Sequence, residues 1–225
     1  MSIEINTRDC AVLSDSELSV MADLSEAAGS SFDIGCLSKA REEWVLVTDV
    51  RKDDKLTGYA FYTLERIGGT PAIVVGIMLA ESGPNSRETM LAIREGQFRK
   101  ALLAFPDEDV LVGTRLTDQG GFEIFEGLVD IVPQPGHKPS GEERAWARRL
   151  ARRFGGEHRI DDRSFVLTGT GETIGYTAYV PPAPSAQFAG FGDFFVGLDA
   201  ERRDSLIALG WIMAEELAKY SGFDD

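Results

Sequence analysis

The sequence contains very few residues that could bind a transition metal or form a disulfide. Among its 225 residues are two cysteines and two histidines. These residues, Cys10, Cys36, His137 and His158, show no paired spacing such as Cys-x-x-Cys. We therefore expect no metal site, and two cysteines in so long a chain fit a reducing compartment.

Long hydrophobic runs are also missing. The longest run, residues 71–80, has the length of a strand and falls short of the roughly 18 residues that a membrane span needs. The N-terminus reads Met-Ser-Ile-Glu and has no basic segment ahead of an apolar one, so no secretory signal is visible. We therefore expect a cytoplasmic location and no contact with a membrane.

Basic residues are scarce relative to acidic ones. The chain has 23 Lys and Arg against 37 Asp and Glu, which gives a formal net charge of −14. Such a surface repels phosphate backbones and disfavours nucleic acid as a partner. The charge either only keeps the protein soluble or attracts a cationic substrate. The 43% hydrophobic content supplies enough apolar material for the core of one large domain.

Four segments have the composition of β-strands. β-branched and aromatic residues are frequent in residues 44–50, 57–66, 72–79 and 110–116. Gly68-Gly69 marks a hairpin between the second and third segments. A helix is expected over residues 87–105, ended by Pro106. The pattern predicts one sheet in which the first three segments are antiparallel neighbours.

The last third of the chain carries two further helix signals. Ser140-Gly141-Glu142-Glu143 is a capping box, and the arginine-rich helix that it starts is expected to run to about Phe154. We expect its arginines to pair with carboxylates of the same chain. A terminal helix is expected over residues 199–220, with an apolar stripe that either closes the core or meets its own copy in a homodimer. The stripe consists of Leu206, Leu209, Met213, Leu217 and Tyr220.

Two helix starts in a fixed order carry a resemblance to a known family. The apolar strand at 71–80 leads into Arg87-Glu88-Thr89-Met90-Leu91-Ala92, and the strand at 110–114 leads into residues 118–126, with a short helix expected over 121–128. This order resembles the GCN5-related N-acetyltransferase (GNAT) superfamily over about residues 3–132. The resemblance implies an α+β fold with a mixed, mostly antiparallel central sheet flanked by helices. It implies an acyl-CoA-binding core, residues 1–135, followed by a C-terminal extension, residues 136–225.

The resemblance also implies a function and a site. GNAT proteins transfer an acyl group, here expected to be acetyl, directly from acyl-CoA to an amine, and a small-molecule or peptide amine is the expected acceptor. The CoA pyrophosphate would lie at the N-terminus of the helix, where free backbone amides bind anions, beside Ser82, Gly83, Asn85, Ser86 and Arg87. The pantetheine arm would follow the central strand at Ile77, Met78 and Leu79.

Two positions depart from the family pattern. Met90 stands where the phosphate loop of the family has its middle glycine, and Phe125 stands where a tyrosine often acts as general acid. The alternative function is therefore a catalytically inactive GNAT-like binding or assembly module. In that reading Met90 packs in the core and Arg87 only caps a surface turn.

No catalytic residue is assigned from the sequence. Candidates for proton transfer are Tyr59, Tyr62, Glu65 and Glu81. Aromatic residues of amphipathic strands more often pack across the sheet, and carboxylates at strand ends are more often solvated. The glycine-rich segment 169–172 lacks the following helix and lysine of a phosphate-binding loop, so we expect a hairpin turn there.

Overall fold

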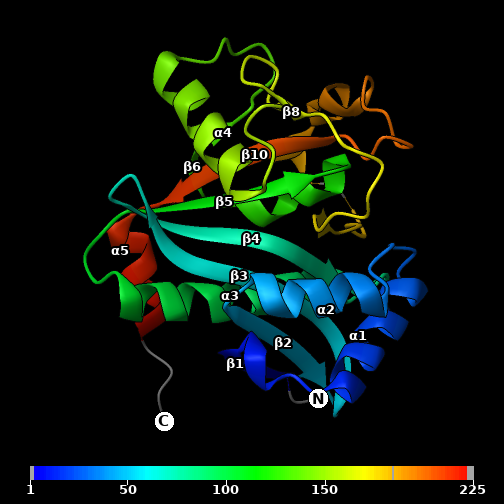
Figure 1. Ribbon diagram of the computed structural model, residues 1–225. Coiled ribbons are helices and arrows are strands. Elements are labelled where there is room, and N and C mark those ends of the chain that lie inside the picture. The colour runs from blue at the N-terminus through cyan, green and yellow to red at the C-terminus, as the bar shows by residue number, and fades with distance from the viewer. Residues whose placement is uncertain (1–2, 184, 222–225) are drawn as a thin grey trace.

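The computed structural model describes residues 3–183 and 185–221, and a single mixed sheet forms its centre (Figure 1). The ten strands of this part of the chain run in the order β1-β2-β3-β4-β9-β5-β10-β8-β7, and β6 pairs with β10 off this path. Most neighbours are antiparallel, whereas β4, β5 and β9 are parallel to one another. The strands are β1 Ile3–Asp9, β2 Leu46–Lys52, β3 Lys55–Ile67, β4 Thr70–Ala80, β5 Val110–Leu116, β6 Val129–Val132, β7 Ile160–Asp161, β8 Val166–Leu167, β9 Thr177–Ala178 and β10 Ser205–Ile212.

Helices cover both faces of this sheet. Helix α3 (Ser86–Ala104) packs against β1 to β4, with α5 (Ala214–Leu217) beside it. Helix α2 (Ile34–Glu43), next to α1 (Asp15–Ala27), and helix α4 (Gly141–Arg153) lie over the other face (Figure 1). In the described part of the chain, no helix combines the length and apolar character needed to cross a membrane. Short 3-10 turns complete the chain at Cys10–Val12, Gln119–Phe125, Ala186–Phe188, Phe191–Phe195 and Ala218–Ser221.

The four strands expected from composition are confirmed. β2, β3 and β4 are antiparallel neighbours, and Phe61 of β3 lies between Val47 of β2 and Ile77 of β4. The β3–β4 turn uses Gly68 and Gly69 at φ angles of 62° and 92°, a region that glycine enters without steric cost. β5 joins the same sheet by parallel pairing with β4. The order of helices and strands up to β6 is the one that the GNAT resemblance implies, and the α+β class is confirmed.

Two of the longer helices begin at capping boxes. The box at Ser140 is confirmed: its hydroxyl accepts a hydrogen bond from the Glu143 N–H, and the Glu143 carboxylate accepts one from the Ser140 N–H. Helix α1 starts with the same arrangement at Ser14 and Glu17. Hydrogen bonds from Ser14 lower the pKa of Glu17 to about 2. Both helices therefore begin with their first free amides satisfied by their own side chains.

The arginine-rich end of α4 pairs within the chain, as expected. Arg144 and Arg148 both bind Asp162, and the Arg153 guanidinium lies 2.8 Å from the Glu65 carboxylate. These ion pairs tie α4 to the β7 region and to β3. The helix therefore fixes the second half of the chain on the sheet.

The expectation of a terminal helix over residues 199–220 is wrong. Ser205–Ile212 form β10, which is antiparallel to β5 with Leu209 opposite Gly113. All side chains from residue 205 to 210 are buried, because both faces of this part of the sheet are covered. A strand buried on both faces is apolar throughout, and such a run also satisfies the spacing of a helical stripe.

This strand also changes how the second half of the chain is understood. β10 lies inside the sheet beside β5, so the residues after 135 supply part of the core sheet. The homodimer expected through a terminal helix loses its structural basis, because only α5 and one 3-10 turn follow β10 among the described residues. The division of the chain at residue 135 stays a prediction.

A bulge in β4 positions the strand that borders the candidate site. Tyr62 of β3 lies opposite Val75 and Phe61 lies opposite Ile77, so Gly76 is the extra residue. A Cβ atom at Gly76 would lie 1.9 Å from the ring of Trp44, and Trp44 is itself buried at the end of α2. The indole therefore rests directly on the backbone of the bulge.

This contact predicts the effect of a single methyl group. Gly76→Ala should lower the free energy of unfolding by about 1–3 kcal/mol, the usual effect of overpacking a core. Gly141→Ala is the matched control, because nothing lies within 4 Å of its Cβ position in the first turn of α4. That control should leave stability unchanged or raise it by up to about 1 kcal/mol. Urea unfolding measures both, and equal midpoints would show that Trp44 does not constrain the bulge.

Candidate functional site

The strands β4 and β5 separate halfway along their length. They pair directly from Ala72 opposite Leu111 to Val75 opposite Thr114. Beyond that point β9 lies between them, and Thr177 pairs with both Met78 of β4 and Leu116 of β5. The gap between the two strands is therefore filled by a later segment of the same chain.

Polar contacts fix β9 in this gap. The Thr177 side chain is fully buried, and its Oγ1 lies 2.9 Å from Oγ1 of Thr114. Thr114 Oγ1 also donates to the carbonyl of Val75, at 3.0 Å, at the point where β4 and β5 separate. The Met78 N–H donates to the carbonyl of Tyr176, at 3.2 Å. Without this segment the Met78 N–H would lose the partner named here, whereas Thr114 would keep its bond to Val75.

Glycines on the surrounding segments leave room for β9. A Cβ atom at Gly120 would lie 2.1 Å from the Tyr179 carbonyl oxygen, and one at Gly175 would lie 2.6 Å from the Gly76 carbonyl oxygen. Tyr179 is 2% exposed, and Ser86 donates to the neighbouring Val180 carbonyl, at 3.3 Å. Glycine at both positions therefore lets the segment around β9 approach its neighbours closely.

The residues predicted for the pantetheine arm lie along this filled gap. Met78 and Leu79 pair with Thr177 and Ala178 of β9. Ile77, the residue before Met78, lines a cavity beside α2. Binding of a pantetheine arm along β4 stays a prediction, and it requires that β9 leave its place.

The residues predicted for the pyrophosphate lie at the start of α3. Asn85 precedes the helix without a side-chain hydrogen bond to it, and Gly83 adopts a φ of 129° in the turn before it. Ser82 borders a small space beside Ala80, and Ser86 is fully buried. Arg87 pairs with Glu126, at 2.7 Å, and this pairing raises its pKa. The pyrophosphate assignment also stays a prediction.

The two departures from the family pattern are core residues. Met90 and Phe125 are both 0% exposed, as the alternative reading expects for Met90. The carbon Cδ1 of Phe125 lies 3.1 Å from the Cβ position of Gly210, so this ring fills space that a glycine leaves open. Neither side chain reaches a surface from which it could act on a bound molecule.

Three of the four candidate proton donors are buried or paired, whereas Glu81 is half-buried directly after β4. Tyr59 and Tyr62 are fully buried, and burial raises the pKa of Tyr62 to about 12. Glu65 pairs with Arg153. Cys36 borders the cavity, but burial raises the pKa of its thiol to about 11, so it is not a thiolate near neutral pH. Neither Tyr62 nor the Cys36 thiol is therefore poised to give up a proton near neutral pH.

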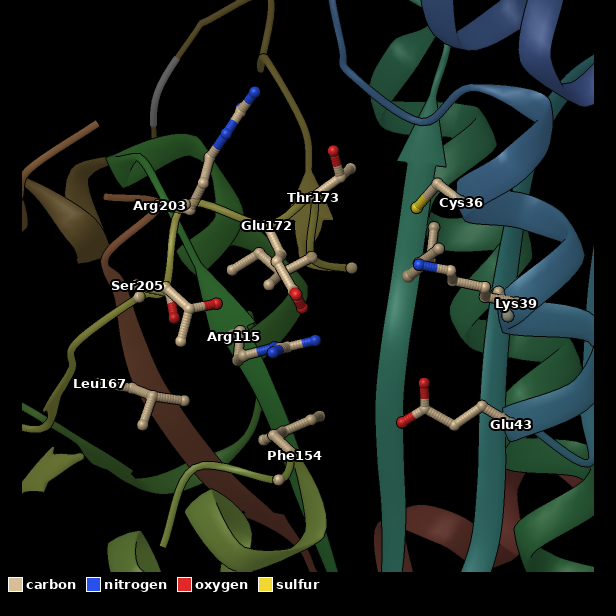
Figure 2. A pocket seen from close by; sticks show the side chains of 18 of the residues that line it. Cys36, Lys39, Glu43, Arg115, Phe154, Leu167, Glu172, Thr173, Arg203 and Ser205 are labelled. Carbon is tan, nitrogen blue, oxygen red and sulfur yellow. The ribbon is translucent and has the colours of Figure 1, made fainter. Parts of the chain in front are cut away.

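A cavity of about 710 Å³ lies between α2 and the segments around β5 (Figure 2). Its walls come from α2, from the end of α4 and from the loop 168–175, and its floor includes Ile77 and Arg115. The glycine-rich segment 169–172 lines this cavity and lies outside any helix or strand, without a hairpin of its own. The volume falls within the usual range of small-molecule sites.

Arg115 is the most unusual residue of the cavity. It is 8% exposed, and its guanidinium lies 4.7 Å from the centre of the Phe154 ring. Its Nε has no hydrogen-bond partner among the described residues. Burial lowers its pKa to about 10, and the charge of Glu43 opposes this shift. Arg115 is therefore still a cation at neutral pH and is poorly compensated.

Charged side chains of both signs surround Arg115. Figure 2 shows Lys39 and Glu43 reaching from α2 toward Arg115, and Glu172 reaching toward it from the loop on the other side. Sequence reasoning missed this group. The only signal was a single arginine inside the apolar strand 110–116, where a charge is rarely buried without a partner.

Comparisons with known proteins find remote structural likenesses only. No family model matches the chain, and no curated protein matches it. The ribosomal-protein-S18-alanine N-acetyltransferase of Escherichia coli is similar over 93% of this chain and 95% of its own, at 9% identity and a TM-score of 0.46. The aminoglycoside 6'-N-acetyltransferase of Enterococcus faecium is similar over 59% of this chain and 89% of its own, at 14% identity and a TM-score of 0.41. A GNAT-family acetyltransferase of Bacillus cereus is similar over 60% and 90%, at 10% identity and a TM-score of 0.39.

The fit around β9 predicts what a methyl group at Gly120 would do. Gly120→Ala should displace Tyr179 and loosen β9, so the Met78 amide should exchange with solvent at least about tenfold faster. Gly197→Ala is the control, because nothing lies within 4 Å of that Cβ position. Native-state hydrogen exchange measures both. Equal protection of Met78 in the two variants would mean that β9 is not anchored through Gly120.

Proposed function

We propose that this chain is a GNAT-like binding domain that does not transfer acyl groups and that holds its ligand in the cavity beside Arg115. One observation carries the proposal: β9 fills the gap between β4 and β5, along which an acyl-CoA would have to lie. The Met78 N–H is already bonded to Tyr176, and Thr177 is buried between the two strands. A pantetheine arm would have to replace this hydrogen bond and displace Thr177.

Chemical considerations support the same proposal. General acid catalysis needs a group that can give up a proton near neutral pH. Phe125 has no such proton and is buried, and Tyr62 holds its own proton firmly. The cavity, by contrast, contains a buried cation that has no hydrogen-bonded counter-ion in the described part of the chain, and such groups are frequent at functional sites.

Calorimetry with acetyl-CoA tests the proposal directly. We expect no binding heat and no release of CoA thiol with a panel of amines. Phe125→Tyr and Met90→Gly should not create turnover, because both positions are enclosed by the core. A Kd in the micromolar range, or turnover by the unmodified chain, would contradict the proposal and restore the acyltransferase reading.

The second candidate function is an acyl-CoA-dependent N-acyltransferase acting on a small-molecule or peptide amine. The start of α3 favours it: Asn85 leaves the first amides of the helix without a side-chain cap, and Arg87 is 45% exposed. In this reading β9 leaves the gap when acetyl-CoA binds, and the amine enters from the cavity beside Ile77.

Arg87 separates the two candidates. If acetyl-CoA binds at the start of α3, Arg87→Ala should weaken binding by about 1.5–3 kcal/mol, the contribution of a hydrogen bond to a charged group. Glu126→Gln is the control, because it frees Arg87 from its ion pair and should leave binding equal or tighter. An acetyl-CoA Kd that does not change with Arg87→Ala would remove this residue from the site.

A further inference from the structure

We infer that the cavity beside α2 binds a small amino-acid-like zwitterion, whose carboxylate pairs with Arg115 and whose ammonium group faces Glu43 and Glu172. The inference rests on the proposed binding role of this cavity and adds the chemical class of the ligand. It is carried by a buried cation on the floor and by carboxylates on the walls.

Arg115 determines the buried end of the ligand. This guanidinium is 8% exposed and has no hydrogen-bond partner at Nε within residues 3–183 and 185–221, so an anion would compensate its desolvation. The Phe154 ring holds its position from one side, at 4.7 Å. A planar group held in this way presents two parallel N–H donors, which match a carboxylate better than a spherical ion.

The walls determine the rest of the ligand. Glu43 and Glu172 approach the space in front of Arg115 from opposite sides (Figure 2). The Arg153 guanidinium lies 3.9 Å from Glu43, which leaves the Glu43 carboxylate at the edge of ion-pair distance. Lys39, Arg159 and Arg203 line the same cavity, so groups of both charges surround the space in front of Arg115. The two carboxylates favour a ligand that has a positive group near its carboxylate.

The shape of the cavity fits a small ligand with an apolar part. Its floor and walls include Trp44, Ile77, Phe154 and Leu167 beside the charged groups. Most of the remaining lining is polar, charged or glycine, so the apolar surface is confined to these few side chains. A side chain of the ligand would lie against these apolar residues, while the two charged groups face Arg115 and the carboxylates.

Thermal unfolding of the full chain in the presence of defined compounds tests the inference. The compounds are the L-amino acids, the carboxylic acids that lack their amino group, the corresponding primary amines, and inorganic phosphate. We expect a rise in Tm with at least one amino acid, because a compound that binds only the folded state stabilises it. The matched acid should bind more weakly, and the amine and phosphate should have no effect.

Two buried arginines provide a matched pair of variants. Arg94 is 7% exposed, lies 5.2 Å from the Phe98 ring and also has an unbonded Nε among the described residues, but it donates to the Glu126 carbonyl and lies outside the cavity. Arg94→Gln should lower Tm and keep the response to the amino acid. Arg115→Gln should leave the Tm of the free protein equal or higher. It should also weaken binding of the amino acid by about tenfold or more.

A third variant tests the opposite end of the ligand. Glu172 is exposed on a loop, so Glu172→Gln should fold normally. The variant should bind the amino acid more weakly and should bind the matched carboxylic acid as tightly as before. A purely structural role for Glu172 would change both affinities.

The outcomes distinguish this inference from the proposed function. If no amino acid raises Tm, if phosphate alone does so, if the matched acid binds as tightly as its amino acid, or if Arg115→Gln keeps the response, the inference is overturned. None of these results would alter the expectation that acetyl-CoA does not bind. Binding of acetyl-CoA, in turn, would overturn the proposed function without explaining a response that depends on Arg115.

Discussion

The insertion of β9 between β4 and β5 is the constraint on which the rest of this structure depends. Two parallel strands that separate leave two rows of backbone groups without partners, and such groups are costly when they are buried. Here Thr177 pairs with both strands, and Thr114 bridges to it from the point where they separate. The segment 174–181 therefore supplies hydrogen-bond partners between the two separated strands. A ligand in the gap would take the place of these partners.

The same insertion explains why the chain carries a cavity on the α2 face. To reach the gap, the chain after β8 runs through the loop 168–175 and forms one wall above Arg115. The opposite wall is α2, which Trp44 holds over the bulge at Gly76. The space between the two walls therefore follows from the route of this segment. Its charged lining is a consequence of where Arg115, Glu43 and Glu172 fall along these elements.

The sequence was a good guide to the first half of the fold and a poor guide to the site. Within residues 44–116, β-branched runs and a glycine pair indicate the strands, so the neighbours of β3 could be predicted. Residues 205–212 could not be assigned, because an apolar run buried on both faces has no period of its own. β9 spans two residues in an irregular segment, and only its pairing with distant strands makes it a strand. Arg115 was visible as a charge in an apolar strand, but the sequence does not show which residues would face it.

Arg115 connects stability with binding in this protein. An arginine that folds into an apolar strand loses hydration, and the Phe154 ring and the charge of Glu43 return only part of that free energy. Replacing buried charges by apolar residues of similar volume is often neutral or stabilising. A residue that weakens the free protein is understandable when it stabilises a complex, because proteins give up stability mainly where a ligand is bound. The poorly compensated guanidinium is thus explained more simply by the molecule it binds than by the fold that contains it.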